Sequence, residues 1–256
     1  MTGQFWTAIE NGIAELVIES PPVNALDSVG WRRLSEEIDR LNGDDAVRVI
    51  VVRAEGRGFC AGVDIKELQA HPDRIVEVNA GNYETFRALH RGLKPAIAAV
   101  HGYVLGGGIG ICGAVDIIVA ADDATFGVPE VDRGALGAGA HLQRMFPLQK
   151  VRKMYFTGEP ITAAEAYRLG AVEKVVARGE LRTSALELAG KIAAKSPTIV
   201  RLAKEALNGV EEGDLERHYR WEQGFTAQAY LTGESQEARD AFVEKRDARF
   251  DNTKQD

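Results

Sequence analysis

The first fifty residues alternate between strand-like and helix-like spacing of apolar positions. Apolar and polar residues alternate over positions 5–19, and an Asn-Gly dipeptide between the two halves favours a β-hairpin. Apolar residues then recur every three or four positions up to Gly43. This spacing predicts a helix that Asp27 or Ser28 is placed to cap. The apolar run 47–52 predicts a buried strand.

Two glycine-rich turns interrupt the pattern that follows, and each comes after an apolar strand. The first covers residues 56–66, and the second covers residues 101–110, directly after the apolar run 96–100. A helix is predicted between them at 73–91, and a further strand follows at 117–120. This alternation of strands and helices is typical of an α/β fold.

Helical spacing dominates the last third of the chain. Four helices are predicted, at 181–195, 197–208, 214–231 and 235–249. Ser196-Pro197 separates the first two, because proline is favoured in the first turn of a helix. The change in composition here divides the chain into an α/β core, residues 1–195, and a helical C-terminal segment, residues 196–256.

Composition and charge narrow the classes of function. The 256 residues carry a formal net charge of −7, which argues against nucleic acid as a partner. No apolar run reaches the length of about 18 residues that a membrane span needs, and the N-terminus lacks a signal-peptide pattern. Cys60 and Cys112 have no CxxC spacing and the five histidines are scattered, so we expect a reduced, cytoplasmic protein without a metal site.

The second glycine-rich turn has two chemical interpretations. Gly108 to Gly113 fits the pattern GxGxxG, but too few residues precede the next strand for the crossover helix of a dinucleotide-binding unit. The other interpretation uses both turns together. Because each turn follows a strand, they could direct two main-chain N–H groups at one carbonyl oxygen and form an oxyanion hole.

Three segments carry a resemblance to a known family. These are GFCAGVDIKEL at 58–68, PAIAAVHGYVLGGGIGICGAVDIIVAA at 95–121 and FGVPE at 126–130. They resemble the crotonase (enoyl-CoA hydratase/isomerase) superfamily, and the resemblance extends from residue 21 to residue 250. It implies a spiral of ββα units in residues 1–195. It also implies that the helical segment 196–256 assembles the chain into homotrimers, which can pair into hexamers.

The resemblance also implies a set of site residues. The substrate would be an acyl-CoA thioester, and no separate cofactor would be needed because CoA is part of the substrate. The N–H groups of Val63 and Gly107 would form the oxyanion hole. The residues that would lie along CoA are Val63, Asp64, Ile65 and Lys66, with Gly107 at the thioester. Lys245 matches a family lysine that reaches the CoA phosphates, from this subunit or a neighbouring one.

The chain departs from the family where hydratases keep two catalytic glutamates. Glu130 stands at one of these positions and would be the acid/base group, but Gly110 stands at the other. The glycine would leave room for a bulkier substrate. Some relatives carry an aspartate at the position of Ala138, so the dehalogenase and ring-isomerase chemistry of those relatives is disfavoured.

Polar residues near Glu130 also differ from the family pattern. Asp132, Arg133 and His141 stand where relatives usually have apolar residues or glycine. We expect Asp132 and His141 to take part in catalysis at one wall of the site. The alternative is that Asp132 and Arg133 form a surface or interface pair and that His141 is structural.

Four functions remain open at this point. The first is a hydratase-type lyase in the catabolism of lipids or ring compounds. The second is hydrolysis of a C–C bond in a cyclic β-diketone CoA ester, because GVPEVDRGALGAGAHL at 127–142, EQGF at 222–225 and RDAFVEKR at 239–246 resemble the ring-opening CoA hydrolases of steroid breakdown. The third is a Δ3–Δ2 enoyl-CoA isomerase, and the fourth is a non-catalytic CoA-binding or scaffold protein. An RNA-binding member is disfavoured by the acidic net charge.

Overall fold

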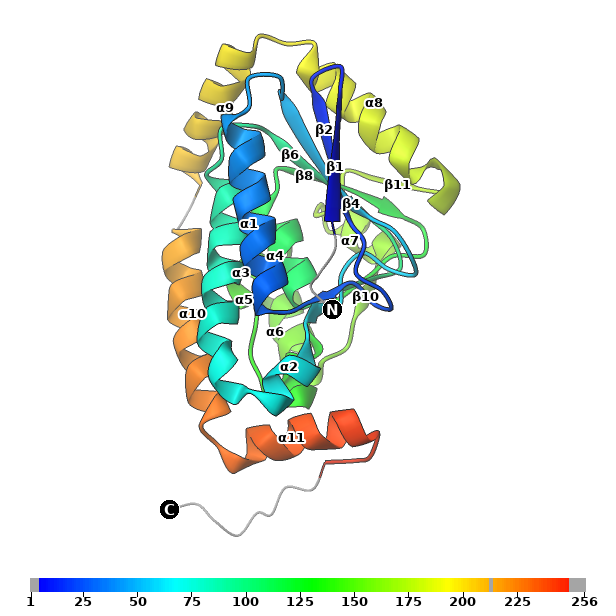
Figure 1. The fold of residues 1–256 in the computed structure, drawn as a ribbon. Coiled ribbons are helices and arrows are strands. Elements are labelled where there is room, and N and C mark those ends of the chain that lie inside the picture. The colour runs from blue at the N-terminus through cyan, green and yellow to red at the C-terminus, as the bar shows by residue number, and fades with distance from the viewer. Residues whose placement is uncertain (1–4, 212–213, 249–256) are drawn as a thin grey trace.

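A six-stranded sheet forms the centre of the protein in the computed structural model, which describes residues 5–211 and 214–248 (Figure 1). The strand order is β1-β2-β4-β6-β8-β11; β1 is antiparallel to β2 and the other neighbours are parallel. The strands are β1 (Phe5–Glu10), β2 (Ile13–Ile18), β4 (Val49–Ala54), β6 (Ala96–Val100), β8 (Ile117–Ala121) and β11 (Lys174–Val176). The predicted hairpin is confirmed, since Asn11 and Gly12 both take the positive φ of a tight hairpin turn, 52° and 79°.

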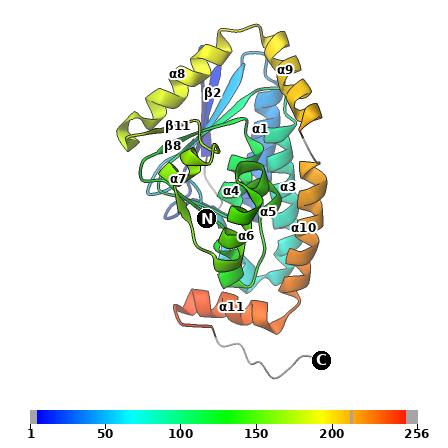
Figure 2. The ribbon, with the colours of Figure 1, turned by 180° about the vertical axis from the view of Figure 1, so that it is seen from behind.

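Helices cover both faces of this sheet. Helix α8 (Leu181–Ala193) packs on the face that carries Val49 and Val51 of β4. Helix α1 (Ser28–Gly43) belongs to the larger core on the opposite face, which carries Ile50 and Val52. Figures 1 and 2 show α8 on one side of the sheet and α1 on the other. The continuous apolar runs of the inner strands are explained by this burial on both faces.

Helices α1 and α3 (Ile75–His90) lie side by side on the larger core (Figure 2). Asp27 caps α1 by accepting a hydrogen bond from the N–H of Gly30 at 2.7 Å. Gly81 permits the close approach of the two helices, because a Cβ there would lie 2.8 Å from the Cβ of Trp31. A short 3₁₀ turn, Pro72–Arg74, precedes α3, so the observed helix begins two residues later than the predicted start at residue 73.

Two small sheets hold the glycine-rich turns in place. One pairs β3 (Ala25–Leu26) with β5 (Gly62–Val63), and the other has the order β10-β9-β7. The strands of the second sheet are β7 (Tyr103–Leu105), β9 (Thr125–Gly127) and β10 (Ile161–Thr162). No strand was predicted at β3, β5, β7, β10 or β11, because strands of two or three residues are too short to show alternation. Helices α2 (Ile65–Ala70) and α4 (Gly107–Ala114) begin where the two turns end.

A turn and three short helices complete the core. The 3₁₀ turn η2 (Pro129–Arg133) follows β9. The helices are α5 (Gly139–Met145), α6 (Leu148–Thr157) and α7 (Ala163–Arg168). Thr162 caps α7 through the N–H of Glu165, as the capping-box spacing of these residues indicates.

The C-terminal helices pack back onto the core. They are α9 (Pro197–Val210), α10 (Leu215–Tyr230) and α11 (Gly233–Glu244). Helix α10 runs beside α3, and α11 crosses the end of the molecule beside α2, where Gln69 meets Asp240 (Figure 1). Helix α11 ends earlier than predicted, because Lys245 adopts a left-handed conformation with φ of 57°. The predicted helical residue 249 and the segment 250–256 lie outside the described residues, and the division of the chain at residue 195 stays a prediction.

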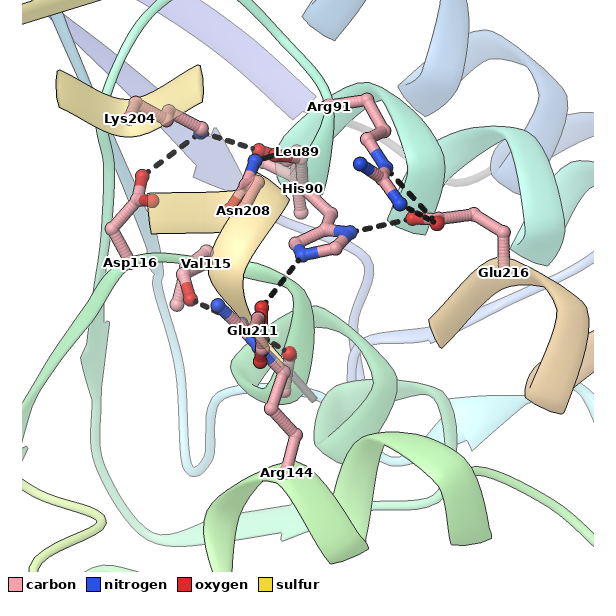
Figure 3. A network of polar contacts seen from close by, with 11 residues as sticks. Leu89, His90, Arg91, Val115, Asp116, Arg144, Lys204, Asn208, Glu211 and Glu216 are labelled. Carbon is pink, nitrogen blue, oxygen red and sulfur yellow. Dashed lines mark hydrogen bonds and ion pairs between the residues drawn. The ribbon is translucent and has the colours of Figure 1, made fainter. Parts of the chain in front are cut away.

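Polar side chains centred on the buried residues His90 and Lys204 connect α9 and α10 to α3. We call this group the polar clamp; its residues are His90, Asp116, Arg144, Lys204, Glu211 and Glu216 (Figure 3). His90 lies between two carboxylates, with Nδ1 2.6 Å from Glu216 and Nε2 3.2 Å from Glu211. Glu211 also accepts a hydrogen bond from Arg144. Burial acts to raise the pKa of Glu216, but hydrogen bonds from His90 and Arg91 outweigh it and lower the pKa to about 2.

Lys204 is the second centre of the polar clamp. Its ammonium group donates to the carbonyl oxygens of Leu89 and Lys94 at 2.7 and 3.0 Å and contacts Asp116 at 2.9 Å. Three donors thus meet three acceptors, which satisfies a side chain that is only 5% exposed. In the described ranges no helix combines the length and the apolar character needed to cross a bilayer.

Candidate active site

The two glycine-rich turns meet at the start of α4. A Cβ on Gly62 would lie 3.0 Å from the backbone nitrogen of Gly107, so the two segments are in van der Waals contact. Gly107 is the first residue of α4, where a backbone N–H has no acceptor within the helix. Val63 follows Gly62 in β5, and both Val63 and Gly107 line the same cavity. The arrangement can present two donors to one carbonyl oxygen.

Five parts of the chain enclose this cavity. They are β5 with α2, α3 from its start to Phe86, the start of α4, η2 with the loop 135–138, and α10. Apolar side chains line the part near α2 and α3, including Leu68, Val78 and Phe86. Because α10 contributes Tyr219, Gln223 and further residues, the C-terminal helical segment completes the wall of the site.

Glu130 is the acidic side chain that borders the cavity among the described residues. It belongs to η2, and Gly106 and Gly137 pack against it. Gly106 has a positive φ of 51°, and a Cβ there would overlap the Glu130 carboxylate. Glycine is therefore needed at this position for both conformation and space.

The electrostatic environment of Glu130 suits proton transfer. Burial raises its pKa to about 7, although a backbone hydrogen bond and the nearby Arg133 act to lower it. Its Oε2 atom is sealed from solvent and has no hydrogen-bond partner in the described part of the chain. A carboxyl group with this pKa exchanges protons readily near neutral pH.

Phe86 fills the space beside Gly110. A Cβ on Gly110 would overlap the Phe86 ring, which itself lines the cavity. The expectation that Gly110 leaves room for a bulkier substrate is therefore wrong, because an aromatic ring from α3 occupies that room. The family's second carboxylate is absent, and a side chain larger than glycine would displace Phe86.

The structure separates the three polar residues expected at one wall. Arg133 lines the cavity, and its guanidinium lies 4.5 Å from the centre of the Phe242 ring. Asp132 is exposed and its carboxylate lies against Gly158. Within the described chain Asp132 is not part of the cavity lining, so the expected catalytic contact is not seen.

His141 also lies behind the cavity wall rather than in it. Its ring packs edge-on against Phe86 and Tyr219, with centroid distances of 4.7 and 4.8 Å. Burial lowers its pKa to about 3, so the ring is neutral at physiological pH. His141 is absent from the described lining residues, whereas Phe86, which packs against it, lines the cavity. The expected catalytic contact of His141 is therefore not seen.

The residues expected along CoA are arranged around the start of α2. Asp64 caps this helix by accepting a hydrogen bond from the N–H of Lys66 at 2.9 Å, and Ile65 lines the cavity. The side chains of Lys66 and Lys245 are exposed. Their contacts with CoA stay predictions. In the described ranges no three His, Cys, Asp or Glu side chains gather in a way that could hold a metal ion.

Sequence reasoning missed the polar side chains of α3 and α10 that line the cavity. Asn82 lies between Val78 and Phe86 at helical spacing, so a polar residue stands within an apolar stripe. That interruption was the available signal. Tyr219 and Gln223 gave none, because their place in the cavity depends on how α10 packs against α3.

The sequence matches the family model described as enoyl-CoA hydratase/isomerase over residues 8–253. The chain belongs to the enoyl-CoA hydratase/isomerase family. Among its relatives is a (7aS)-7a-methyl-1,5-dioxo-2,3,5,6,7,7a-hexahydro-1H-indene-carboxyl-CoA hydrolase of Mycobacterium tuberculosis. The two are 45% identical over 93% of this chain and 98% of the relative. A short-chain-enoyl-CoA hydratase of Clostridium acetobutylicum is 34% identical over 93% of each protein.

Solved structures of this enoyl-CoA hydratase/isomerase family agree with the fold. An enoyl-CoA hydratase/isomerase from Xanthobacter autotrophicus superposes with a TM-score of 0.86 at 25% identity, over 95% of this chain and 93% of the other. An enoyl-CoA hydratase from Mycobacterium smegmatis gives 0.78 at 30% identity, over 96% and 98%. The crotonase fold predicted from the sequence is confirmed.

Proposed function

We propose that this member of the family hydrolyses a C–C bond in the ring of a cyclic β-diketone CoA ester. One observation carries the proposal: Glu130 is the one carboxylate among the described residues that line the cavity, and Phe86 fills the space beside Gly110. A family hydratase uses a carboxylate at that position to hold its water. A reaction with one proton-transfer group therefore fits this cavity better than hydration.

The bond changes of this reaction need one base and one oxyanion hole. Glu130 takes a proton from water as the water oxygen adds to a ring ketone carbon. The C–C bond to that carbon then breaks, and its electron pair passes into the conjugated thioester as an enolate. The N–H groups of Val63 and Gly107 stabilise the enolate oxygen. Glu130 returns the proton to carbon, which leaves a carboxylic acid and an intact CoA thioester.

The pKa of Glu130, about 7, supports this double role. Near neutral pH the carboxylate and carboxylic acid forms are both populated, so one group can accept a proton and later return it. Arg133 contributes a positive charge beside Glu130 that favours the ionised form needed in the first step.

Relatives add support for hydrolysis. Proteins of Mycobacterium tuberculosis and Rhodococcus jostii named as hydrolases of a dioxo-hexahydroindene-carboxyl-CoA are each 45% identical to this chain. The hydratases among the relatives reach 34%. A bicyclic CoA ester with two ketones is therefore the first substrate to test.

Isomerisation of a Δ3-enoyl-CoA to a Δ2-enoyl-CoA is a second candidate, since it needs one base that moves a proton along the chain. The Glu130 carboxylate would suffice for it. A panel of crotonyl-CoA, a 3-enoyl-CoA and a bicyclic diketone CoA ester separates the reactions by mass spectrometry. Ring opening with retention of CoA supports the proposal. Addition of water to crotonyl-CoA at a rate typical of hydratases, with no ring opening, would refute it.

We also propose that the chain assembles as a cytoplasmic homotrimer or hexamer. Apolar side chains on α10 and α6 support assembly; Trp221 is 74% and Phe156 is 67% exposed in the single chain. Light scattering of the purified protein should give three or six chains per particle. A monomeric wild type would contradict this, and Trp221→Asp should lower the number of chains.

A further inference from the structure

The end of the cavity between α3 and α10 is polar, although every side chain there is buried. Asn82 of α3 is 6% exposed, and Tyr219 and Gln223 of α10 are each 5% exposed. All three line the cavity. A hydrocarbon acyl chain offers no hydrogen-bond partner to polar groups in this position.

Most of the polar groups here are already satisfied within the protein. The Gln223 amide donates to the carbonyl oxygen of Asn79 at 2.7 Å, and the Thr226 hydroxyl donates to the carbonyl oxygen of Leu136 at 2.7 Å. These two bonds join α10 to α3 and to the loop that follows η2. They hold the cavity wall in place and leave neither group free for a ligand.

Asn82 is different, because its Oδ1 atom has no hydrogen-bond partner within the described chain. Burial raises the pKa of the Tyr219 phenol, and the neighbouring Asn82 side chain acts to lower it. Tyr219 therefore lies beside Asn82 in the cavity lining, and the Asn82 oxygen remains unpaired. An unpaired buried oxygen costs free energy, and in native proteins such a group calls for an explanation.

We propose that Asn82 and Tyr219 form an oxygen-binding subsite, which receives a keto or hydroxyl group of the acyl moiety remote from the thioester. Asn82 Oδ1 accepts a hydrogen bond from a hydroxyl, and the Tyr219 hydroxyl donates to a ketone. This inference rests on the proposed function, because it takes an acyl-CoA as the ligand and names the class: ring acyl groups that carry a second oxygen function.

The subsite gives the cavity a means of rejecting hydrocarbon acyl groups. Leu68, Val78 and Phe86 form an apolar wall that accepts the ring of either kind of ligand. A ring hydroxyl pairs with Asn82 Oδ1 and a ring ketone pairs with the Tyr219 hydroxyl, whereas a plain ring offers a partner to neither group. Sites built to hydrogen-bond a substrate oxygen discriminate strongly against analogues that lack it.

Calorimetric binding of three unreactive ligands tests the subsite. They are cyclohexane-carboxyl-CoA, 4-oxocyclohexane-carboxyl-CoA and 4-hydroxycyclohexane-carboxyl-CoA, none of which is a β-diketone. Wild type should bind the two oxygenated ligands at least about tenfold more tightly. Asn82→Leu should remove the preference for the hydroxyl ligand. Asn208→Leu, an equal change in the polar clamp region outside the cavity lining, should keep it.

Tyr219→Phe gives a second test should Asn82→Leu fail to fold. It keeps the ring that packs on Phe86 and removes only the hydroxyl, so the preference for the keto ligand should fall about tenfold. Equal binding of all three ligands by wild type, or an equal loss for all three in the variants, would overturn the subsite. Ring opening of a diketone ester is measured separately: selective binding without it refutes the proposed reaction alone, and ring opening without selective binding refutes the subsite alone.

Discussion

Two buried polar groups lie along α3, and they differ in how completely they are paired. At the C-terminal end of α3, His90 belongs to the polar clamp, where each ring nitrogen meets a carboxylate (Figure 3). Two helical turns earlier, Asn82 faces the cavity with an unpaired oxygen. Glu130, across the same cavity, has an unpaired Oε2.

Paired buried polar groups stabilise the fold, whereas unpaired ones are available to bind a ligand. Paired buried groups are destabilising to break, because the remaining partner is left uncompensated. Unpaired groups already carry that cost in the free protein. Changes in the polar clamp should therefore reduce stability, whereas changes at Glu130 and Asn82 should reduce activity or binding without reducing stability.

The largest expected effect is on activity in Glu130→Gln. The substitution keeps the shape of the side chain and removes the acid/base group, so kcat should fall by about 10³-fold. The pKa of Glu130 in the folded protein, about 7, lies above its usual value of 4.5. Wild type therefore loses stability as the pH rises through 7, and the variant should unfold at a higher temperature than wild type at pH 8. Steady-state kinetics and thermal unfolding check the two parts.

Near-full turnover by Glu130→Gln would remove Glu130 from the mechanism. The same variant tests the pH dependence. Wild-type kcat/KM should fall below pH 7 as the carboxylate becomes protonated, and any residual activity of the variant should lack that fall.

Lys204→Met should cost stability and spare catalysis. It leaves Asp116 and the carbonyl oxygens of Leu89 and Lys94 without their donor, so the free energy of unfolding should drop by about 3 kcal/mol. Denaturant unfolding measures this loss. Below the unfolding transition, kcat/KM per folded molecule should match wild type. A loss of kcat in the folded variant would contradict the assignment of the polar clamp to stability alone.

A paired change at Phe86 and Gly110 should convert the cavity toward hydration. Gly110→Glu alone should be poorly folded because its side chain overlaps Phe86. Adding Phe86→Ala removes the ring and makes room for a second carboxylate. The double variant should then consume the enoyl absorbance of crotonyl-CoA at least tenfold faster than wild type. Phe86→Ala alone is the control variant and should show no such gain. No gain in the folded double variant would mean that Phe86 does not set the reaction.

The smallest expected effect comes from Arg133→Met. Arg133 acts to lower the pKa of Glu130, so its removal should shift the fall in kcat/KM to higher pH by less than about one pH unit. A pH–rate profile measures the shift, and Arg152→Met, on an exposed position of α6, is the matched control. A shift to lower pH would contradict the direction of this coupling.

Local sequence signals predicted the frame of the molecule well and its cavity only in part. The Asn-Gly turn, the Asp27 cap and the strand at 96–100 depend on neighbouring residues, and all three were found. The contact between Phe86 and Gly110 depends on how α3 packs against α4. No pattern within either helix encodes that contact, so the glycine was taken for empty space.

The position of His141 also depends on tertiary packing that the local sequence does not encode. Its departure from the family pattern near Glu130 in the sequence made it a candidate for the site. The packing of Phe86 and Tyr219 around its ring turns it into part of the wall. Conversely, Asn82 lies far from Glu130 in sequence and reaches the same cavity through the tertiary fold.

The decisive measurement is the hydrolysis of a bicyclic diketone CoA ester in ¹⁸O-labelled water. The product should have gained one water molecule, keep its CoA thioester and carry a single ¹⁸O in a new carboxylic acid, and it should form about 10³-fold more slowly with Glu130→Gln. Release of free CoA with ¹⁸O in the thioester-derived acid, or recovery of the intact ring, would contradict the proposed reaction.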